Sequence, residues 1–182
     1  MNSKNNLSIA KRYAKSLIEL MLDGENNQAE IKSDLNNVKE ILTSSPDLAS
    51  AMTNPIVSAH DKEEIIKAVF EHDTKEITRN FLQLLVKKNR FDLIYQIIDS
   101  FNKMLDKINN IAQVSVTGAI ELQESDKSEI KNRLKEKLSK EVNIEYNVDD
   151  SIIAGLIYKI EDDVLDTSFL HKLEELKKEL IK

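Results

Sequence analysis

Residues 142–160 read VNIEYNVDDSIIAGLIYKI and contain the clearest strand signal in the chain. The first part, Val142–Val148, alternates strictly between apolar and polar side chains, as expected of a strand with one buried face. The second part, Ile152–Ile160, is apolar on both faces, which is typical of a central strand. The stretch therefore predicts two strands that follow each other closely, joined by a polar turn.

The flanking segments extend this pattern into a small domain. Ile111–Thr117 (IAQVSVT) is rich in β-branched residues and predicts another strand. Asp126–Lys140 predicts a helix, because apolar residues recur in it at a spacing of four. Ser168 can cap a final helix that carries Leu170, Leu173, Leu176 and Leu180. Residues 109–182 therefore predict an α+β domain with the element order β-α-β-β-α.

The first 108 residues predict helices almost throughout. Ser8 is expected to cap a first helix that runs to Leu22, and the last helix is expected from Phe91 to Asn109. Between them, helix starts are predicted at Pro46 after Ser45, at Ser58 with Asp61 as a capping box, and at Thr74. A second helix is predicted on the stripe Ile31, Leu35, Val38 and Leu42. Short polar turns between six helices predict a compact six-helix bundle.

Composition argues for a binding protein rather than an enzyme. The 182 residues include no Cys and only 3 Gly, which excludes disulfides, thiolate metal sites and Gly-rich phosphate loops. The net charge of −6 disfavours general binding to nucleic acid. Residues 1–110 carry 15 basic and 16 acidic side chains, against 11 and 16 in residues 111–182, so the acidity lies in the second part. No apolar run is long enough to span a bilayer, and no secretory signal is expected.

Two local clusters could in principle carry chemistry. Asp166, Ser168 and His171 bring together the residue types of a catalytic triad, but Ser168 fits a helix cap better. The acidic run Glu161, Asp162, Asp163, with Asp166, lacks the spacing of a calcium loop and fits a tight turn between the third strand and the next short segment. We therefore expect no catalytic residues, no metal and no cofactor.

Four pieces of the chain resemble the δ subunit of F-type ATP synthases, a family that includes the mitochondrial oligomycin-sensitivity-conferring protein. Residues 9–17, IAKRYAKSL, resemble the family's opening Ala-x-x-Tyr-Ala motif. The resemblance continues through Asn54-Pro55-Ile56 and through the segment from Phe81 to Phe101. Residues 150–168 resemble the family's C-terminal signature, although Ala154, Glu161 and Thr167 replace family glycines. The four pieces occur in register over essentially the whole chain.

The resemblance implies a non-catalytic stator subunit. Residues 1–108 would bind the N-terminal helical segments of the α subunits in the catalytic head, and residues 109–182 would bind the b subunits of the peripheral stalk. One copy per complex is implied, peripheral to the cytoplasmic face of the membrane in bacteria, with no membrane insertion and no nucleic acid. The head-binding residues carried over are Tyr13, Ala14, Leu17, Asn80, Leu84 and Lys88. For the stalk they are Asp150, Gly155, Asp166 and Leu173.

Alternatives remain at this point. Leu17 and Leu84 could simply be core residues, because apolar side chains at helical spacing usually are. The β-α-β-β-α order could also belong to a small RNA-binding module or another adaptor. An RNA-binding sheet requires exposed aromatic side chains, and the strands offer only Tyr146 and Tyr158.

Overall fold

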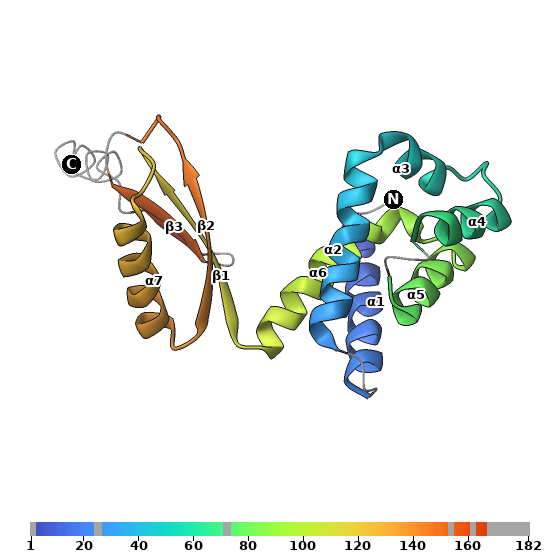
Figure 1. Cartoon of the computed structure of the whole chain (residues 1–182), viewed down its shortest axis with the longest axis horizontal. Helices are drawn as coiled ribbons and strands as arrows, with labels where there is room; N and C mark the ends of the chain where they lie inside the picture. Colours follow the sequence, from blue (N-terminus) through green and yellow to red (C-terminus); the bar gives the residue numbers. More distant parts are fainter. Residues whose placement is uncertain (1–2, 24–26, 71–73, 153–154, 161–162, 167–182) are drawn as a thin grey trace. The chain divides into compact units, whose positions relative to one another are not determined.

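The computed structural model describes residues 3–23, 27–70, 74–152, 155–160 and 163–166 (Figure 1). The chain divides into two compact units, residues 1–105 and residues 106–182. We call them the helical unit and the sheet unit. The prediction of a mostly helical chain with a small C-terminal sheet is confirmed.

Within the described residues, the helical unit is built from α-helices and one 3-10 turn. In chain order these are α1 (Ser3–Asp23), α2 (Gln28–Ser44), α3 (Pro46–Thr53), α4 (Ala59–Phe70), α5 (Glu76–Lys87), the 3-10 turn η1 (Phe91–Leu93) and α6 (Ile94–Ile108), whose last turn belongs to the sheet unit. Their apolar stripes form one core. It includes the predicted stripe of α2 and, from α6, Ile94, Ile97, Ile98, Phe101 and Leu105. Burying each such side chain contributes about 1.5–3 kcal/mol, so the core holds this unit together.

Local capping signals explain some of the helix starts. The Ser58 hydroxyl accepts from the backbone N–H of Asp61 at 3.1 Å, which is one of the two hydrogen bonds of the predicted capping box, and it donates to the Asp61 carboxylate at 2.7 Å. Ser45 is the N-cap of α3, and Pro46 follows as its first residue. The absent N–H of a proline costs nothing there, because the first helical N–H groups have no partner within the helix.

Two predicted caps are wrong. The first helix begins at Ser3, so Ser8 lies inside it. The N-cap of α5 is Lys75, and the hydroxyl of Thr74 donates instead to the Phe70 carbonyl at 2.6 Å. The start of α5 is held by a distant residue, Asp34 of α2. Its carboxylate accepts from the Lys75 N–H at 2.6 Å and from the Thr78 hydroxyl at 3.0 Å.

The sheet unit has a four-stranded sheet in the order β2-β1-β3-β4. The elements are β1 (Ile111–Gly118), α7 (Glu124–Leu138), β2 (Glu141–Val148), β3 (Leu156–Ile160) and β4 (Asp163–Asp166). β1 runs parallel to β2 and antiparallel to β3, and β4 is antiparallel to β3. β1 and β3 are therefore the central strands, as the apolar pattern of the third strand predicted.

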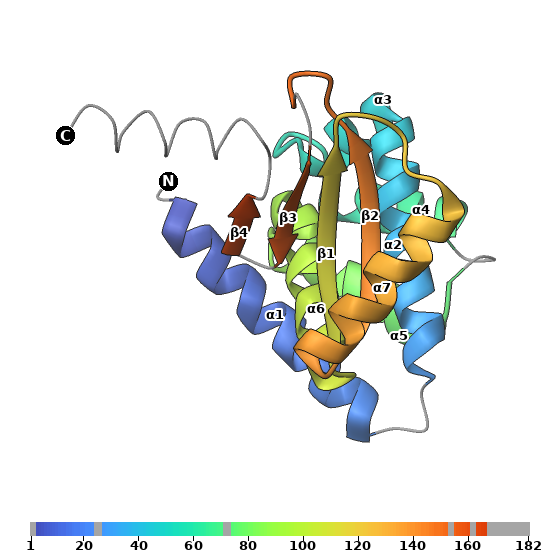
Figure 2. The ribbon, with the colours of Figure 1, turned by 90° about the vertical axis from the view of Figure 1, so that its left-hand side faces the viewer.

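The two faces of the sheet differ in polarity. Val114, Val116 and Val142 lie on one face and form a core with Leu134 of α7. Figure 2 shows α7 in front of β1 and β2, with β3 and β4 beside it. The opposite face is polar between β1 and β2, and there Asn143 donates to Gln113 at 2.9 Å and Asn147 to Ser115 at 3.0 Å. One apolar face and one polar face are usual for a small sheet that a helix covers on one side.

The strand boundaries differ from the prediction in two places. The third strand begins at Leu156 rather than Ile152, after Gly155 with a φ of 101°. Asp163–Asp166, expected to lie in and after a turn, forms the edge strand β4. The final helix predicted from Ser168 lies outside the described residues, as do Ala154, Glu161, Asp162 and Thr167.

Candidate functional site

An aromatic contact brings α1 and α5 together. The rings of Tyr13 and Phe81 meet edge to face, with centroids 6.4 Å apart and planes at 71°. Along α1 and α5, several apolar side chains on the same side as these rings are half-buried or exposed. We call this set the α1–α5 strip, and it consists of Ile9, Tyr13, Leu20, Ile77 and Leu84.

The α1–α5 strip combines support from the core with exposed area. Ile9, Tyr13 and Ile77 are half-buried and pack against the helical core. Leu20 and Leu84 are 58% and 41% exposed. At 3.6 residues per turn, Leu20 lies two turns after Tyr13, and Leu84 lies almost one turn after Phe81. The strip is therefore a supported apolar surface with two protruding leucines.

The structure separates the six head-binding residues predicted from the sequence. Ala14 and Leu17 are 0% and 1% exposed, so they belong to the core and offer no surface to a partner. Tyr13 and Leu84 lie in the α1–α5 strip, while Asn80 and Lys88 are exposed at one turn on either side of Leu84.

The sequence prediction missed Leu20 and Ile77 as surface candidates. The wide apolar arc of α1, broadened by Ile9 and Leu20, was the available signal for a second contact surface.

A second exposed apolar region lies at one end of the sheet. Ile120 and Val148 are 75% and 54% exposed, just after β1 and at the end of β2. The Asp149 N–H donates to the Gly118 carbonyl at 2.9 Å, which ties the ends of the two strands together. We call this region, residues 118–120 and 148–151, the sheet tip.

Two acidic residues, Asp149 and Asp150, follow Val148 directly in the sheet tip. Asp150 is exposed there, and Gly155 is exposed just before β3. Hydrogen bonds from Ser151 to the Asp149 carboxylate, through its hydroxyl and its backbone N–H, lower the pKa of Asp149. Of the other predicted stalk residues, Asp166 ends β4, opposite Ile157 of β3, and Leu173 lies outside the described residues.

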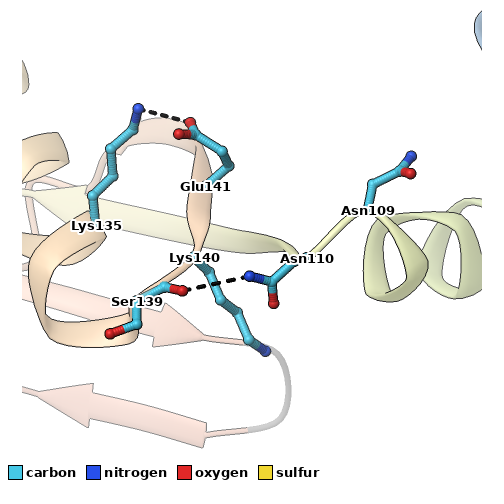
Figure 3. A pocket seen from close by; sticks show the side chains of 6 residues that line it. All are labelled: Asn109, Asn110, Lys135, Ser139, Lys140 and Glu141. Atoms are coloured by element: carbon cyan, nitrogen blue, oxygen red, sulfur yellow. Dashed lines mark hydrogen bonds and ion pairs between the residues drawn. The ribbon is translucent and has the colours of Figure 1, made fainter.

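A polar concavity of about 380 Å³ lies where α7 turns into β2, and Figure 3 shows the six side chains that line it. Lys135 and Glu141 form an ion pair at 2.7 Å, and the Asn110 amide donates to the Ser139 carbonyl at 3.4 Å. The Lys135 ammonium lowers the pKa of Glu141 through this hydrogen bond. These contacts hold the turn in place and join no nucleophile to a base.

The sequence also raised two hypotheses about chemistry, a metal site and a catalytic triad. The described residues contain no group of three or more acidic or His side chains that could hold a metal ion. Ser168 and His171 of the hypothetical triad lie outside them. In the part of the chain that the structure covers, no helix is long and apolar enough to cross a membrane.

The tyrosines that an RNA-binding sheet would need are not open stacking platforms. Tyr146 and Tyr158 both pack against the core beneath α7. The Tyr146 hydroxyl donates to the Lys127 carbonyl of α7 at 3.0 Å. Burial raises the pKa of both phenols. The sheet face that remains free is the polar one, which lacks aromatic side chains among its described residues.

Comparison with known proteins gives a consistent result. A family model described as "ATP synthase delta (OSCP) subunit" matches residues 9–180. The chain is 38% identical to ATP synthase subunit delta of Halothermothrix orenii, over 97% of this chain and 92% of the relative. It is 34% identical to the chloroplastic subunit delta of Galdieria sulphuraria, over 93% and 96%.

A solved structure has the same fold. A chain of the Toxoplasma gondii mitochondrial ATP synthase hexamer superposes with a TM-score of 0.75 at 20% identity. The match covers 95% of this chain and 97% of that one.

Proposed function

Because the chain belongs to the ATP synthase delta (OSCP) subunit family, it is a non-catalytic stator subunit of an F-type ATP synthase, and we propose that its two units bind different parts of that complex. The helical unit, as a six-helix bundle, binds the N-terminal helical segments of the α subunits. The sheet unit binds the b subunits of the peripheral stalk. One copy links the two and keeps the head from turning with the rotor, on the cytoplasmic side of the membrane in bacteria.

The α1–α5 strip is the observation that supports head binding. An amphipathic helix binds by placing apolar anchors at a spacing of three and four onto an apolar surface. The strip offers such a surface along two adjacent helices, with the exposed polar residues Asn80 and Lys88 at its edge. Leu20 and Leu84 protrude from it, so a docked helix would bury them. The contact between the rings of Tyr13 and Phe81 joins the two helices within this surface.

Two leucines on α1 provide a matched test of head binding. Leu20 and Leu22 are 58% and 52% exposed, but at 100° per residue they point to nearly opposite sides of the helix. The full chain is titrated calorimetrically with a peptide from the N-terminus of the α subunit of the same organism. We expect Leu20→Ala to weaken binding about tenfold, since losing one anchor costs about 1.4 kcal/mol. Leu22→Ala should leave the affinity unchanged.

Two results would contradict the head-binding proposal. The first is the absence of binding by the unmodified chain at high micromolar peptide. The second is an equal loss of affinity in the Leu20 and Leu22 variants, because that would place the peptide elsewhere or point to a general effect on α1. Circular dichroism of each variant checks that the helices remain folded.

The sheet tip supports stalk binding. Ile120 and Val148 present apolar area to solvent in the same region as Asp149 and Asp150, so a helix end with apolar and basic side chains would complement it. The test measures binding of a C-terminal b-subunit fragment to the full chain. Ile120→Ser should weaken binding several-fold. Ile56→Ser, which changes an even more exposed isoleucine (88%) in the helical unit, is the control. Equal affinity of both variants would exclude the tip as the stalk contact.

A further inference from the structure

The apolar face of the sheet is only partly covered. A groove of about 530 Å³ runs between α7 and β3. Its apolar lining comes from Leu122, from Ile130 and Leu138 of α7, and from Leu156, Tyr158 and Ile160 of β3. We call it the β3 groove. All six side chains are half-buried, so the core of this unit continues into the groove.

The width of the sheet explains why the groove is there. Four strands about 4.8 Å apart make a surface wider than one helix, which is about 10 Å across. Two contacts join α7 to β2. The Tyr146 hydroxyl donates to the Lys127 carbonyl, and Lys135 forms an ion pair with Glu141. The helix therefore covers β1 and β2, and the β3 side of the same apolar face needs a second cover (Figure 2).

We infer that the β3 groove is the docking site of the chain's own C-terminal segment, residues 167–182. The described chain ends at Asp166, the last residue of β4, which neighbours β3. At about 1.5 Å per residue, a helix over residues 167–182 would be about 24 Å long. α7 has 15 residues, so a helix of that length would match it along the groove. The sequence places Leu173, Leu176 and Leu180 on one side of such a helix.

The strand register fixes the direction in which the segment enters. Asp166 pairs with Ile157, and the adjacent Leu156 pairs with Gly118 at the end of β1. α7 starts shortly after that same end, at Glu124. The C-terminal segment therefore enters beside the start of α7 and runs in the same direction.

The rim formed by α7 is acidic first, at Asp126 and Glu129, and then basic, at Arg133 and Lys137. The segment carries Lys172 near its start, then Glu174 and Glu175, and then Lys177 and Lys178. In a parallel arrangement Lys172 would face the acidic part of the rim, while the later charges alternate in sign, so the direction rests on the strand register. This inference is independent of which unit binds the head or the stalk.

The absence of cysteine makes the inference directly testable. Two cysteines introduced into this chain can form an intramolecular disulfide only with each other. In the full chain, Arg133→Cys is combined in turn with a cysteine at each position from 169 to 180. We expect the disulfide yield under mild oxidation to peak every three to four positions and to exceed the minima several-fold. Asn132→Cys, exposed one position earlier on another side of α7, is the matched control and should give low, flat yields.

Hydrogen exchange gives an independent measurement. Leu173→Asp should increase exchange at the β3 amides several-fold while the β1–β2 amides keep their protection. Lys172→Asp should change neither.

Three results would overturn the inference. The disulfide yield could be the same at every position, it could equal that of the Asn132 control, or disulfides could form only between molecules. The same holds if a b-subunit fragment protects β3 while the segment gives a flat profile, because the groove would then belong to the stalk.

Discussion

Replacing Asp34 by alanine removes the acceptor that holds the start of α5. The carboxylate comes from α2, is 9% exposed, and accepts from the Lys75 N–H at 2.6 Å and from the Thr78 hydroxyl at 3.0 Å. Thr78 is 0% exposed, so its hydroxyl has no access to water once the carboxylate is gone. α5 carries Ile77 and Leu84 of the α1–α5 strip, so this contact also supports the proposed docking surface.

The expected loss of stability follows from the two hydrogen bonds that Asp34 accepts. A hydrogen bond to a charged group contributes about 1.5–3 kcal/mol, and loss of a helix N-cap alone costs about 1 kcal/mol. Because Lys75 is exposed, water can replace part of its bond. We expect Asp34→Ala to lower the free energy of unfolding of the helical unit by about 3 kcal/mol. With a urea dependence of about 1.5 kcal/mol per M, the midpoint falls by about 2 M.

The assay is urea unfolding of the full chain followed by the helical circular dichroism signal. Asp34→Asn keeps an oxygen acceptor and should cost about 1 kcal/mol. Thr78→Val removes the hydroxyl at nearly constant shape, so the double variant Asp34→Ala/Thr78→Val should be more stable than the sum of the single effects implies. Two results would refute this account of the buried carboxylate. The first is that the destabilisation of the double variant equals the sum of the two single effects within about 0.5 kcal/mol. The second is that Asp34→Ala lowers the free energy of unfolding by less than about 1 kcal/mol.

Three further predictions concern the sheet unit, each measured by denaturant unfolding followed at the strand amides. Gly118→Ala should destabilise it by about 1–2 kcal/mol, because the new Cβ would lie 3.1 Å from Cδ2 of Leu156. Ser139→Gly should stabilise it by up to about 1 kcal/mol, since Ser139 has a φ of 52° and glycine adopts this conformation without strain. Lys135 lowers the pKa of Glu141 below its ordinary value of 4.5, so the stabilising effect of this carboxylate is present above pH 4.5 and lost as pH falls through the lowered value. Glu141→Gln should flatten that part of the pH profile, with only a small change because the pair is exposed.

Local periodicity predicted most of the fold. The stripe of α2, the alternation of β2 and the capping box at Ser58 and Asp61 each involve residues within a few positions of one another. Such signals depend on backbone geometry alone, so they need no knowledge of the tertiary structure.

The missed features depend on contacts between distant residues. Asp34 caps α5 across 41 positions of sequence, and no local pattern indicates that a residue within α2 would do so. β4 contains only Asp163–Asp166, which is too short to show an alternation, and it becomes a strand by pairing with β3. Periodicity also could not separate Leu17, which is core, from Leu20, which is exposed, because both lie within the same apolar arc.

The difference between the buried Leu17 and the exposed Leu20 bears on how a stator subunit can hold a partner under load. A side chain such as Leu17 cannot serve the fold and a partner at once, because removing it leaves a cavity in the core. Leu20 and Leu84 are exposed, yet half-buried residues such as Tyr13 fix the surface beneath them. A partner helix on the α1–α5 strip would therefore meet a surface that is already ordered, so binding would cost little additional side-chain entropy. Apolar contacts of this kind are also insensitive to screening by salt, unlike an interface built on surface ion pairs. A rigid, largely uncharged contact surface is what a link that only transmits force requires.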